Sequence, residues 1–501
     1  MMHIPCSRRL RPSGLSIATA VLACLVAGCP ERQGPTPTSK PFVGTKIIVA
    51  APAGRSFAAN WKVLLDEWSE QTGATVEVRE YGDRPEDPRL KDLLDPSGGS
   101  ATLADTDLLI FSPAEFGELA ADNRLATFSD DQKTALDRVR WIDLFQGLRE
   151  NAASLEKRPA VAPLSSPVLV CYFRRDLLEK AGLSPPAEWS DYQKLLETLD
   201  RWAPGLTAVE PWGEEFRATM FAARAVASVK HPENFSVFFD IDSGEPLIDS
   251  PGFVRALETS RAAVARMPAA IKTYTPADCR REFFAGKAAL AIAFETGPAG
   301  ADPASSPVKR PDGMQVGICR LPGVREVYNR SIKKWTTVSG EEVYRVTLTG
   351  FAGLCAGVSA ASTPDETQAA WNLLATLAVD RFDTAFGEIP RSPTRKSQTA
   401  APENWTGPEL SGDEQLAYVD AVSDALQDAR LVVDLPVAGR DQFRKALSEE
   451  LGKALTTPGD PQAALHAVAD RWRDIAKQVG PDRVVNSYRR ILGLPPRRTM
   501  K

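Results

Sequence analysis

Hydrophobic and polar positions in the first part of the chain alternate between a strand pattern and a helix pattern. The run "KIIVAAP" at 46–52 is short and apolar, and apolar residues then recur at helical spacing from Trp61 to Trp68. The segment "TVEVREY" at 75–81 alternates apolar and polar residues, and "TDLLIF" at 106–111 is continuously apolar. Strands that alternate with helices predict an α/β fold with a parallel sheet.

A second strand and helix unit occupies residues 166–199. "SPVLVCYF" at 166–173 predicts a buried strand, and Ser190 with Gln193 forms a capping box that predicts the start of a later helix. Trp189 directly precedes that helix, where we expect its ring to cover the helix start. Its predicted role is therefore architectural.

The remainder of the chain repeats these signals and then becomes helical. Thr275 and Thr363 each precede a proline, which predicts two capped helices, and a strand is expected at 288–294. Residues 324–348 predict a β-hairpin with "SGEE" as its turn, either solvated or lining a cleft through its aromatic residues. The C-terminal quarter has helical periodicity without strands, so it needs a sheet from elsewhere to pack on.

The chain length and the N-terminal segment predict the number of domains and an export signal. Hydrophobic cores stop growing near ~250–300 residues, so a chain of 501 residues predicts two domains. Three arginines precede an uncharged run at 15–28, which is too short to span a bilayer and is typical of a signal peptide. "LVAGC" at 25–29 resembles the lipobox of bacterial lipoproteins, in which Cys29 receives a lipid; the alternative is an ordinary signal with an incidental cysteine.

Charge and cysteine content narrow the function further. Removal of residues 1–28 takes away three arginines and no acids, which changes the formal net charge from −5 to −8 and argues against a nucleic-acid partner. Residues 29–44 are rich in proline, threonine and serine and predict a flexible tether. Cys171, Cys279, Cys319 and Cys355 remain after them; we expect buried thiols, with a bridge between Cys319 and Cys355 left open.

Motifs for catalysis or metal binding are absent from the sequence. There is no Walker-A loop, no G-x-G-x-x-G after a strand, no H-E-x-x-H, no C-x-x-C and no G-x-S-x-G. The only histidines after the signal peptide, His231 and His466, are far apart. The sequence therefore favours binding over catalysis, with no cofactor and no metal, and an exported glycosidase is kept only as a weak alternative.

The segment "PAVAPLSSPVLVCYFRRDLLEKAGLSPPAEWSDYQKLLETL" at 159–199 resembles the signature region of the family 1 extracellular solute-binding proteins of ABC transporters. Four further segments match that family in order and spacing, although Tyr172, Phe173 and the following arginines replace its usual strand end. The resemblance spans about residues 45–495. It implies a periplasmic-binding-protein-like fold of class II, in which two α/β lobes joined by crossing hinge segments close over a ligand cleft.

The resemblance also implies domain boundaries. Lobe 1 is expected at 45–165 and 322–388, and lobe 2 at 166–321 and 389–501 with the helical C-terminal region. Residues 1–28 and 29–44 are the signal peptide and the tether.

Ligands of α/β sheets lie beyond the carboxyl ends of the strands, so the loops after the strands carry the predicted site. Lobe 1 offers two such loops, and a likeness to maltodextrin-binding relatives implies that Glu210 accepts from hydroxyl groups and Trp212 stacks on a sugar. Where relatives place aromatic residues, the chain has other side chains that suggest a more polar ligand. A packing or solvated role is the alternative for each residue. The predicted ligand-binding residues are Arg55, Ser56, Phe111, Ser112, Glu115, Glu210, Trp212, Glu295, Thr296 and Arg440.

The function implied by the resemblance is that of the solute-binding component of an ABC importer. It would capture a small solute, expected to be a carbohydrate, and deliver it to a membrane permease. The expected protein is a monomer, periplasmic or at the cell surface and held to the membrane by a lipid on Cys29. A lipid-anchored sensor that presents its ligand to a membrane receptor is the alternative.

Overall fold

The computed structural model describes residues 40–53, 57–82, 90–95, 103–128, 133–295, 308–340, 342–380 and 392–497. The predicted signal peptide, Cys29 and most of the tether lie outside this range. Residues 41–501 form one compact unit. Within the described residues no helix combines the length and the apolar character that a membrane crossing requires.

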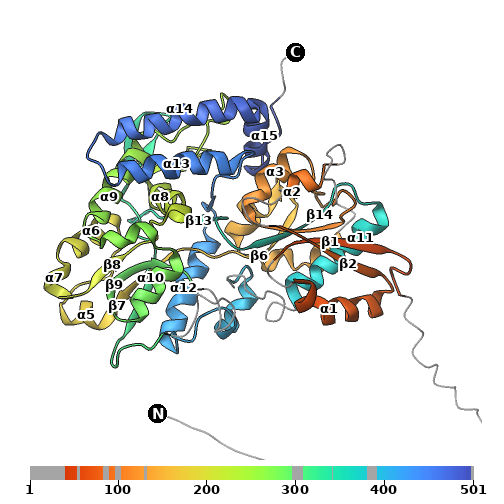
Figure 1. The fold of residues 1–501 in the computed structure, drawn as a ribbon, viewed down its shortest axis with the longest axis horizontal. Coiled ribbons are helices and arrows are strands. Elements are labelled where there is room, and N and C mark those ends of the chain that lie inside the picture. The colour runs from red at the N-terminus through yellow and green to blue at the C-terminus, as the bar shows by residue number, and fades with distance from the viewer. Residues whose placement is uncertain are drawn as a thin grey trace, which may run out of the picture. The chain divides into compact units, whose positions relative to one another are not determined.

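The first sheet has the strand order β2-β1-β3-β14-β6 (Figure 1). β1 is parallel to β2 and β3, whereas β14 returns from much later in the chain and is antiparallel to both β3 and β6. This α/β topology confirms the predicted fold class. The strands are β1 (Lys46–Pro52), β2 (Thr75–Tyr81), β3 (Leu108–Phe111), β6 (Val161–Ser165) and β14 (Leu354–Val358).

Alternating side chains of the first sheet are buried on both faces. Ile47 and Val49 of β1 pack into the core beneath α1 (Phe57–Thr72) and α11 (Pro364–Ala375), whose side chains Trp68 and Asn372 are joined by a hydrogen bond of 2.9 Å. Ala50 faces a second apolar cluster formed with α2 (Leu90–Leu93) and α3 (Phe116–Ala121). Burial on both faces explains the near-continuous apolar sequences of β1, β3 and β14, whereas the edge strand β2 is partly exposed and alternates apolar and polar residues.

The second sheet has the order β10-β7-β9-β8, with β7 antiparallel to β9 and β10 and with β8 parallel to β9. Its strands are β7 (Val170–Arg174), β8 (Thr207–Val209), β9 (Ala288–Ala293) and β10 (Val316–Arg320). Tyr172 points to the face covered by α10 (Pro276–Phe284) and α12 (Asp413–Gln427), where it packs against Phe283 and Tyr418. The other helices associated with this sheet are α5 (Arg175–Lys180), α6 (Trp189–Glu197), α7 (Leu199–Trp202), α8 (Glu214–Val229) and α9 (Pro251–Val264).

Three segments that pass between the two sheets meet through buried hydroxyl groups. Ser166 follows β6, Thr349 ends the short strand β13 (Leu348–Thr349), and Ser392 precedes α12. The hydroxyl oxygens of Ser166 and Thr349 lie 2.7 Å apart, and the Ser392 hydroxyl donates to the Ser166 carbonyl at 3.0 Å. β13 also pairs with β15 (Val432–Val433), so a fourth segment joins this crossing.

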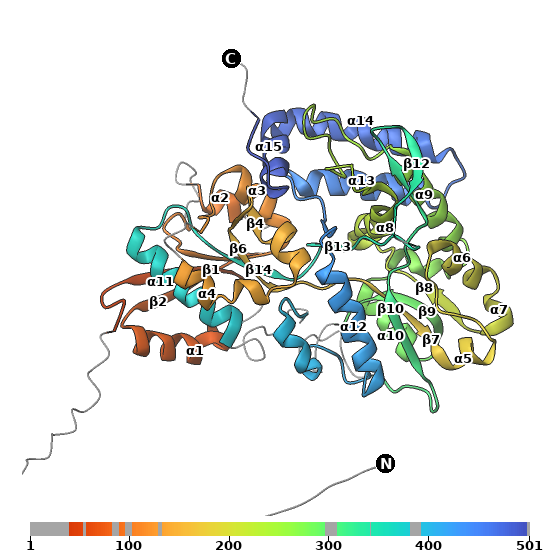
Figure 2. The same cartoon turned by 180° about the vertical axis from the view of Figure 1, so that it is seen from behind.

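The C-terminal helices contact helices associated with each of the two sheets. α13 (Arg440–Ala454) and α14 (Pro461–Val479) pack on α8 and α9, whereas α15 (Pro481–Ile491) packs on α3, as Figures 1 and 2 show. α15 packs on α3 of predicted lobe 1, and through Tyr488 it also accepts hydrogen bonds from Val237 and Phe238 of predicted lobe 2, so the boundaries of the lobes stay a prediction. Its Arg483 and Arg490 form ion pairs with Glu118 and Glu156 on the lobe 1 side, which hold it there.

Two local predictions differ from the structure. α6 begins at Trp189 rather than after Ser190, because the Asp191 carboxylate accepts from the backbone N–H of Glu188 at 3.2 Å. The hairpin of β11 (Glu326–Asn329) and β12 (Lys334–Thr337) turns before the "SGEE" segment, and it packs on α8 and α9 through contacts such as Arg255 over the Trp335 ring. The predicted caps at Thr275 and Thr363 are confirmed.

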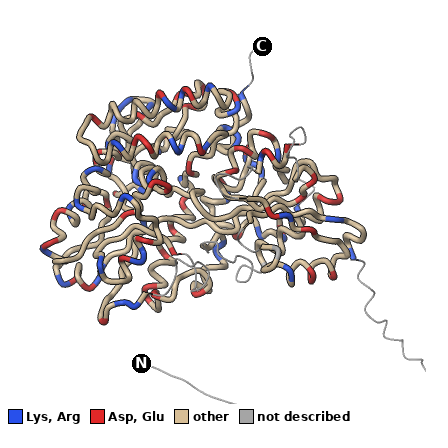
Figure 3. The backbone as a smooth tube through the Cα atoms, in the orientation of Figure 1, with Lys and Arg blue, Asp and Glu red and all other residues tan. Residues whose placement is uncertain are grey.

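Charged residues are interspersed along the chain. Figure 3 shows lysine and arginine residues mixed with aspartate and glutamate residues on the helices, while the central strands are mostly uncharged. Opposite charges that alternate in this way form local ion pairs, such as Lys62 with Asp66, Lys194 with Asp191 and Lys477 with Asp474.

The contact between α15 and residues 237–238 can be tested at Tyr488. Its hydroxyl oxygen accepts from the backbone N–H groups of Val237 at 3.0 Å and Phe238 at 3.2 Å. Tyr488→Phe leaves these buried donors unpaired, so we expect the free energy of unfolding to fall by about 1–3 kcal/mol in urea denaturation. Tyr328→Phe, on the partly exposed hairpin, is the matched control and should change it by less than about 0.5 kcal/mol. Equal stability of the two variants would contradict a structural role for the Tyr488 hydroxyl.

Candidate functional site

The first part of the predicted site lies at the carboxyl end of β3. Phe111 ends this strand and is fully buried in the second apolar cluster, and Ser112 begins the loop to α3. The Ser112 side chain accepts from the Ala114 N–H, and the Glu115 carboxylate accepts from the Ser112 N–H, both at 3.3 Å. Tyr81 supports the loop, since its hydroxyl lies 3.3 Å from Glu115. Ser112 and Glu115 are half-buried, so this loop is ordered and still partly open to solvent.

The loop after β1 lies outside the described residues. It contains the predicted contacts Arg55 and Ser56, and the same holds for Thr296 after β9. Their roles stay predictions from the sequence.

Glu210 and Trp212, which follow β8, are held inside the protein. They are 0% and 1% exposed, and the Trp212 indole N–H donates to the Glu210 carboxylate at 2.9 Å. Arg224 of α8 donates to both Glu210 oxygens, at 2.6 Å and 2.7 Å. The structure therefore gives both side chains protein partners and no free surface, and their direct contact with a ligand stays a prediction.

Trp189 belongs to the same buried group. The guanidinium carbon of Arg224 lies 3.9 Å from the centroid of the Trp189 ring, and Tyr192 packs edge-on against that ring. A cation over an aromatic face in a desolvated setting is worth about 2 kcal/mol. Trp189 thus holds the arginine that neutralises Glu210, in agreement with an architectural role.

Glu295, which follows β9, is also fully buried and fully paired. Its carboxylate accepts from Arg280 at 3.0 Å and 2.9 Å, from the Tyr172 hydroxyl at 2.7 Å and from the Gly407 N–H at 2.7 Å. Burial opposes the charge on Arg280, but the ion pairs with Glu295 and Glu409 raise its pKa above the usual value. The guanidinium therefore stays charged and joins the loop after β9 to residues 407–409.

Arg440, at the start of α13, is also a buried arginine that pairs with a carboxylate. It donates to the Asp434 carboxylate at 2.9 Å and to the Asp434 carbonyl at 3.1 Å, and it is buried. Thr219 of α8 donates to the same carboxylate at 3.1 Å. These contacts tie β15 to α8 and α13 rather than present a free guanidinium.

An aromatic group that the sequence analysis missed lies at the same ends of the strands. Phe216, Phe294 and Phe351, termed here the phenylalanine cluster, come from the first turn of α8, the end of β9 and the segment before β14. The Phe351 ring centroid is 5.5 Å from that of Phe216 and 5.9 Å from that of Phe294. Phe216 is half-buried, whereas the other two rings are buried. Only Phe294 carried a sequence signal, because it directly precedes the predicted contact Glu295.

The crossing segments bring this cluster next to the loop of lobe 1. Gly350 has a positive φ of +76°, and a Cβ at its position would lie 2.7 Å from the Val433 side chain and 3.8 Å from the Pro113 side chain. Pro113 belongs to the loop that begins at Ser112, and Phe351 directly follows Gly350. The Ser112–Glu115 loop and the phenylalanine cluster therefore flank one crossing segment, and we call this region the hinge site.

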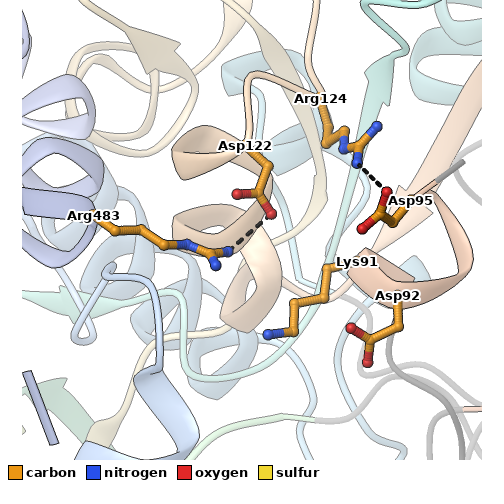
Figure 4. Close-up of a pocket in the computed structure, with 6 residues that line it drawn as sticks. All are labelled: Lys91, Asp92, Asp95, Asp122, Arg124 and Arg483. Carbon is orange, nitrogen blue, oxygen red and sulfur yellow. Dashed lines mark hydrogen bonds and ion pairs between the residues drawn. The ribbon is translucent and has the colours of Figure 1, made fainter. Parts of the chain in front are cut away.

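A separate charged pocket of about 320 Å³ lies between α2, α3 and α15 (Figure 4). Ion pairs cross the pocket, with Arg483 2.9 Å from Asp122 and Arg124 3.9 Å from Asp95. Leu125, beside Arg124, pairs with Ser359 at the end of β14, which places the pocket near the amino end of β3. It is therefore at the opposite end of the sheet from the hinge site. The pocket residues are Lys91, Asp92, Asp95, Asp122, Arg124 and Arg483.

No group of three or more histidine, cysteine, aspartate or glutamate side chains in the described part of the chain is arranged to hold a metal ion. The hinge site itself offers the half-buried ring of Phe216, the hydroxyl group of Ser112 and the carboxylate of Glu115. These groups can bind a neutral polar solute by stacking and hydrogen bonding.

Comparison with solved structures establishes the fold. The sugar-binding protein MalE from Xanthomonas citri has a TM-score of 0.61 at 18% identity, over 87% of this chain and 98% of that chain. Maltose-bound MalE3 of T. maritima has a TM-score of 0.56 at 19% identity, over 86% and 99%. An ABC transporter solute-binding protein from Agrobacterium radiobacter K84 in complex with ribitol has a TM-score of 0.56 at 20% identity, over 88% and 100%.

A family model places the chain more specifically. The model described as bacterial extracellular solute-binding protein matches residues 54–325, more than half of the 501-residue sequence. Members of this family act outside the cytoplasm and bind solutes. The chain therefore belongs to the bacterial extracellular solute-binding protein family and is an exported protein.

Proposed function

We propose that the protein captures a carbohydrate or a polyol at the hinge site and delivers it to the membrane permease of an ABC importer. The observation that carries this proposal is the half-buried ring of Phe216, backed by two buried phenylalanines and flanking the same segment as Ser112 and Glu115. An aromatic face suits the apolar face of a sugar ring, while hydroxyl and carboxylate groups suit its hydroxyls. The solved structures with maltose and ribitol support this class of ligand.

The buried ion pairs act on the site through the backbone. Glu210, Glu295 and Asp434 each follow a strand that ends near the crossing, and each is neutralised by an arginine. Because these loops cannot shift without unpairing a buried charge, they hold Phe216 and Phe294 in place. Glu210, Trp212, Glu295 and Arg440 are thus proposed as positioning residues in this structure, and Arg55, Ser56 and Thr296 as further ligand contacts.

Closure of the two lobes is the proposed mechanism of capture. A ligand that touches both the loop of lobe 1 and the rings of lobe 2 binds the closed arrangement more tightly than an open one. This difference in affinity shifts the population toward the closed form, which the permease would recognise.

We further propose that the protein works as a monomer held to the membrane by a lipid on Cys29. The residues "LVAGC" at 25–29 and the proline-rich tether that follows support this attachment. In cells that process lipoproteins, the wild-type chain should partition into the detergent phase of a Triton X-114 extract. Cys29→Ser should move to the aqueous phase, and equal partitioning of the two would contradict the anchor.

Binding at the hinge site can be measured by isothermal titration calorimetry with maltose, ribitol, mannitol and a wider saccharide panel. Phe216→Ala removes the exposed stacking face, so we expect affinity for the bound solute to fall about tenfold or more. Phe235→Ala, a surface phenylalanine 46% exposed, is the control and should bind as the wild type does. Binding that is unchanged in Phe216→Ala would overturn the site, and a panel with no ligand for the wild type would overturn the solute class.

The positioning role of the Glu210 ion pair predicts a loss of stability. Arg224→Met leaves the buried carboxylate of Glu210 without its cation, so we expect the free energy of unfolding to fall by about 3–5 kcal/mol. Glu210→Gln combined with Arg224→Met removes both charges and should recover most of that loss in chemical denaturation. A double variant no more stable than Arg224→Met alone would show that the charge pair is not what holds this loop.

A further inference from the structure

Two of the four described cysteines face each other across neighbouring strands of the second sheet. β7 and β10 run antiparallel, and their register places Cys171 directly opposite Cys319. Residues opposite each other in a sheet point to the same face. Among the described residues Cys355 has no such partner, since it lies opposite Phe111 and Pro163 in the first sheet, so the bridge between Cys319 and Cys355 left open by the sequence does not fit the fold.

The hydrogen-bond pattern between β7 and β10 indicates the distance between the Cα atoms of Cys171 and Cys319. The Arg175 N–H donates to the Gln315 carbonyl at 2.9 Å, so residues 175 and 315 are a hydrogen-bonded pair. Such pairs alternate along antiparallel strands, and counting in steps of two reaches Cys171 and Cys319. The Cα atoms of a hydrogen-bonded pair lie about 5.5 Å apart, which is within the usual range for a disulfide bond.

The two thiols also differ in access and in acidity. Cys171 is fully buried, whereas Cys319 lies on the edge strand of the sheet and is partly exposed. A hydrogen bond from Cys171, together with the nearby Arg345 guanidinium, lowers the pKa of the Cys319 thiol. The same hydrogen bond and burial raise the pKa of Cys171. Cys319 is therefore the thiol that an outside oxidant meets first.

We propose that Cys171 and Cys319 form a disulfide bond in the exported protein, and that this bond fastens the edge strand β10 to the second sheet. Family membership places the chain outside the cytoplasm, where disulfides form and persist. In the structure both cysteines are free thiols, so the proposed bond requires their oxidation.

The oxidation balances with a disulfide-bearing oxidant such as oxidised glutathione. The Cys319 thiolate attacks one sulfur of the oxidant, forms a mixed disulfide and releases one glutathione thiolate, which takes up a proton. The Cys171 thiolate then attacks the Cys319 sulfur, breaks the mixed disulfide and releases the second glutathione. The protein loses two electrons and two protons, and the oxidant becomes two thiols.

Mass spectrometry of tryptic peptides can detect a disulfide bond between Cys171 and Cys319 without ambiguity. Trypsin releases Cys171 within residues 158–174 and Cys319 within residues 310–320, while Cys279 and Cys355 fall in other peptides. We expect the folded, full-length chain treated with oxidised glutathione to yield the 158–174 and 310–320 peptides linked together, at a mass lower by two hydrogen atoms than the sum of the two. Reduction should separate them.

Single variants test the order of the two steps. Cys171→Ser should leave Cys319 carrying glutathione, Cys319→Ser should leave Cys171 unmodified, and Cys279→Ser should form the linked peptide as the wild type does. A wild-type protein that stops at glutathione on Cys319, or in which both thiols remain free for alkylation, would overturn the proposal.

Thermal unfolding gives a second readout. The bond closes a long loop of the chain, so the oxidised protein should unfold about 5 °C higher than the reduced protein. The Cys171→Ser/Cys319→Ser variant should show the same midpoint under both conditions. A midpoint that is unchanged on oxidation of the wild type would contradict the fastening of β10.

Discussion

The crossing of the chain between its two sheets is the constraint on which the rest of the fold depends. Backbone that passes from one layer to another cannot pair within either sheet, and buried polar groups left unpaired are costly. The small hydroxyl side chains of Ser166, Thr349 and Ser392 satisfy one another and a backbone carbonyl at this point. Because β14 returns to the first sheet after this crossing, the first sheet takes strands from both sides of the crossing, whereas all four strands of the second sheet lie between Ser166 and Thr349.

A second principle is that the carboxyl ends of the strands carry buried acids with arginine partners. Glu210 pairs with an arginine 14 residues later, and Glu295 with one 15 residues earlier. A buried ion pair contributes little net stability, but removal of one partner is strongly destabilising. These pairs therefore fix which conformation the loops adopt more than they add to the stability of the fold.

The order of strands and helices could be predicted from the sequence because each element carries its own period and its own cap. The caps at Thr275 and Thr363 are local signals, and both form as expected. The N-cap of α6 lies two residues before the predicted one, because Glu188 with Asp191 takes the capping role that was expected of Ser190. The position of α15 depends on arginine contacts with α3, which no local pattern encodes.

The candidate site shows the same limit. A glutamate beside a tryptophan after a strand has the chemistry of a sugar site, and it has equally the chemistry of an internal ion pair. Only the position of Arg224 on α8 distinguishes the two, and that position follows from tertiary packing. Phe216 went unnoticed since a single phenylalanine in a helix is most often part of a core.

The contact of α15 with both lobes has a mechanical consequence. Two separate points of attachment, the crossing at Ser166 and the C-terminal helix at Tyr488, define a line through the protein. A rigid lobe held at two points retains only rotation about the line that joins them. As long as both attachments persist, we expect the lobes to move about this single axis, with twisting or sliding of one lobe against the other suppressed.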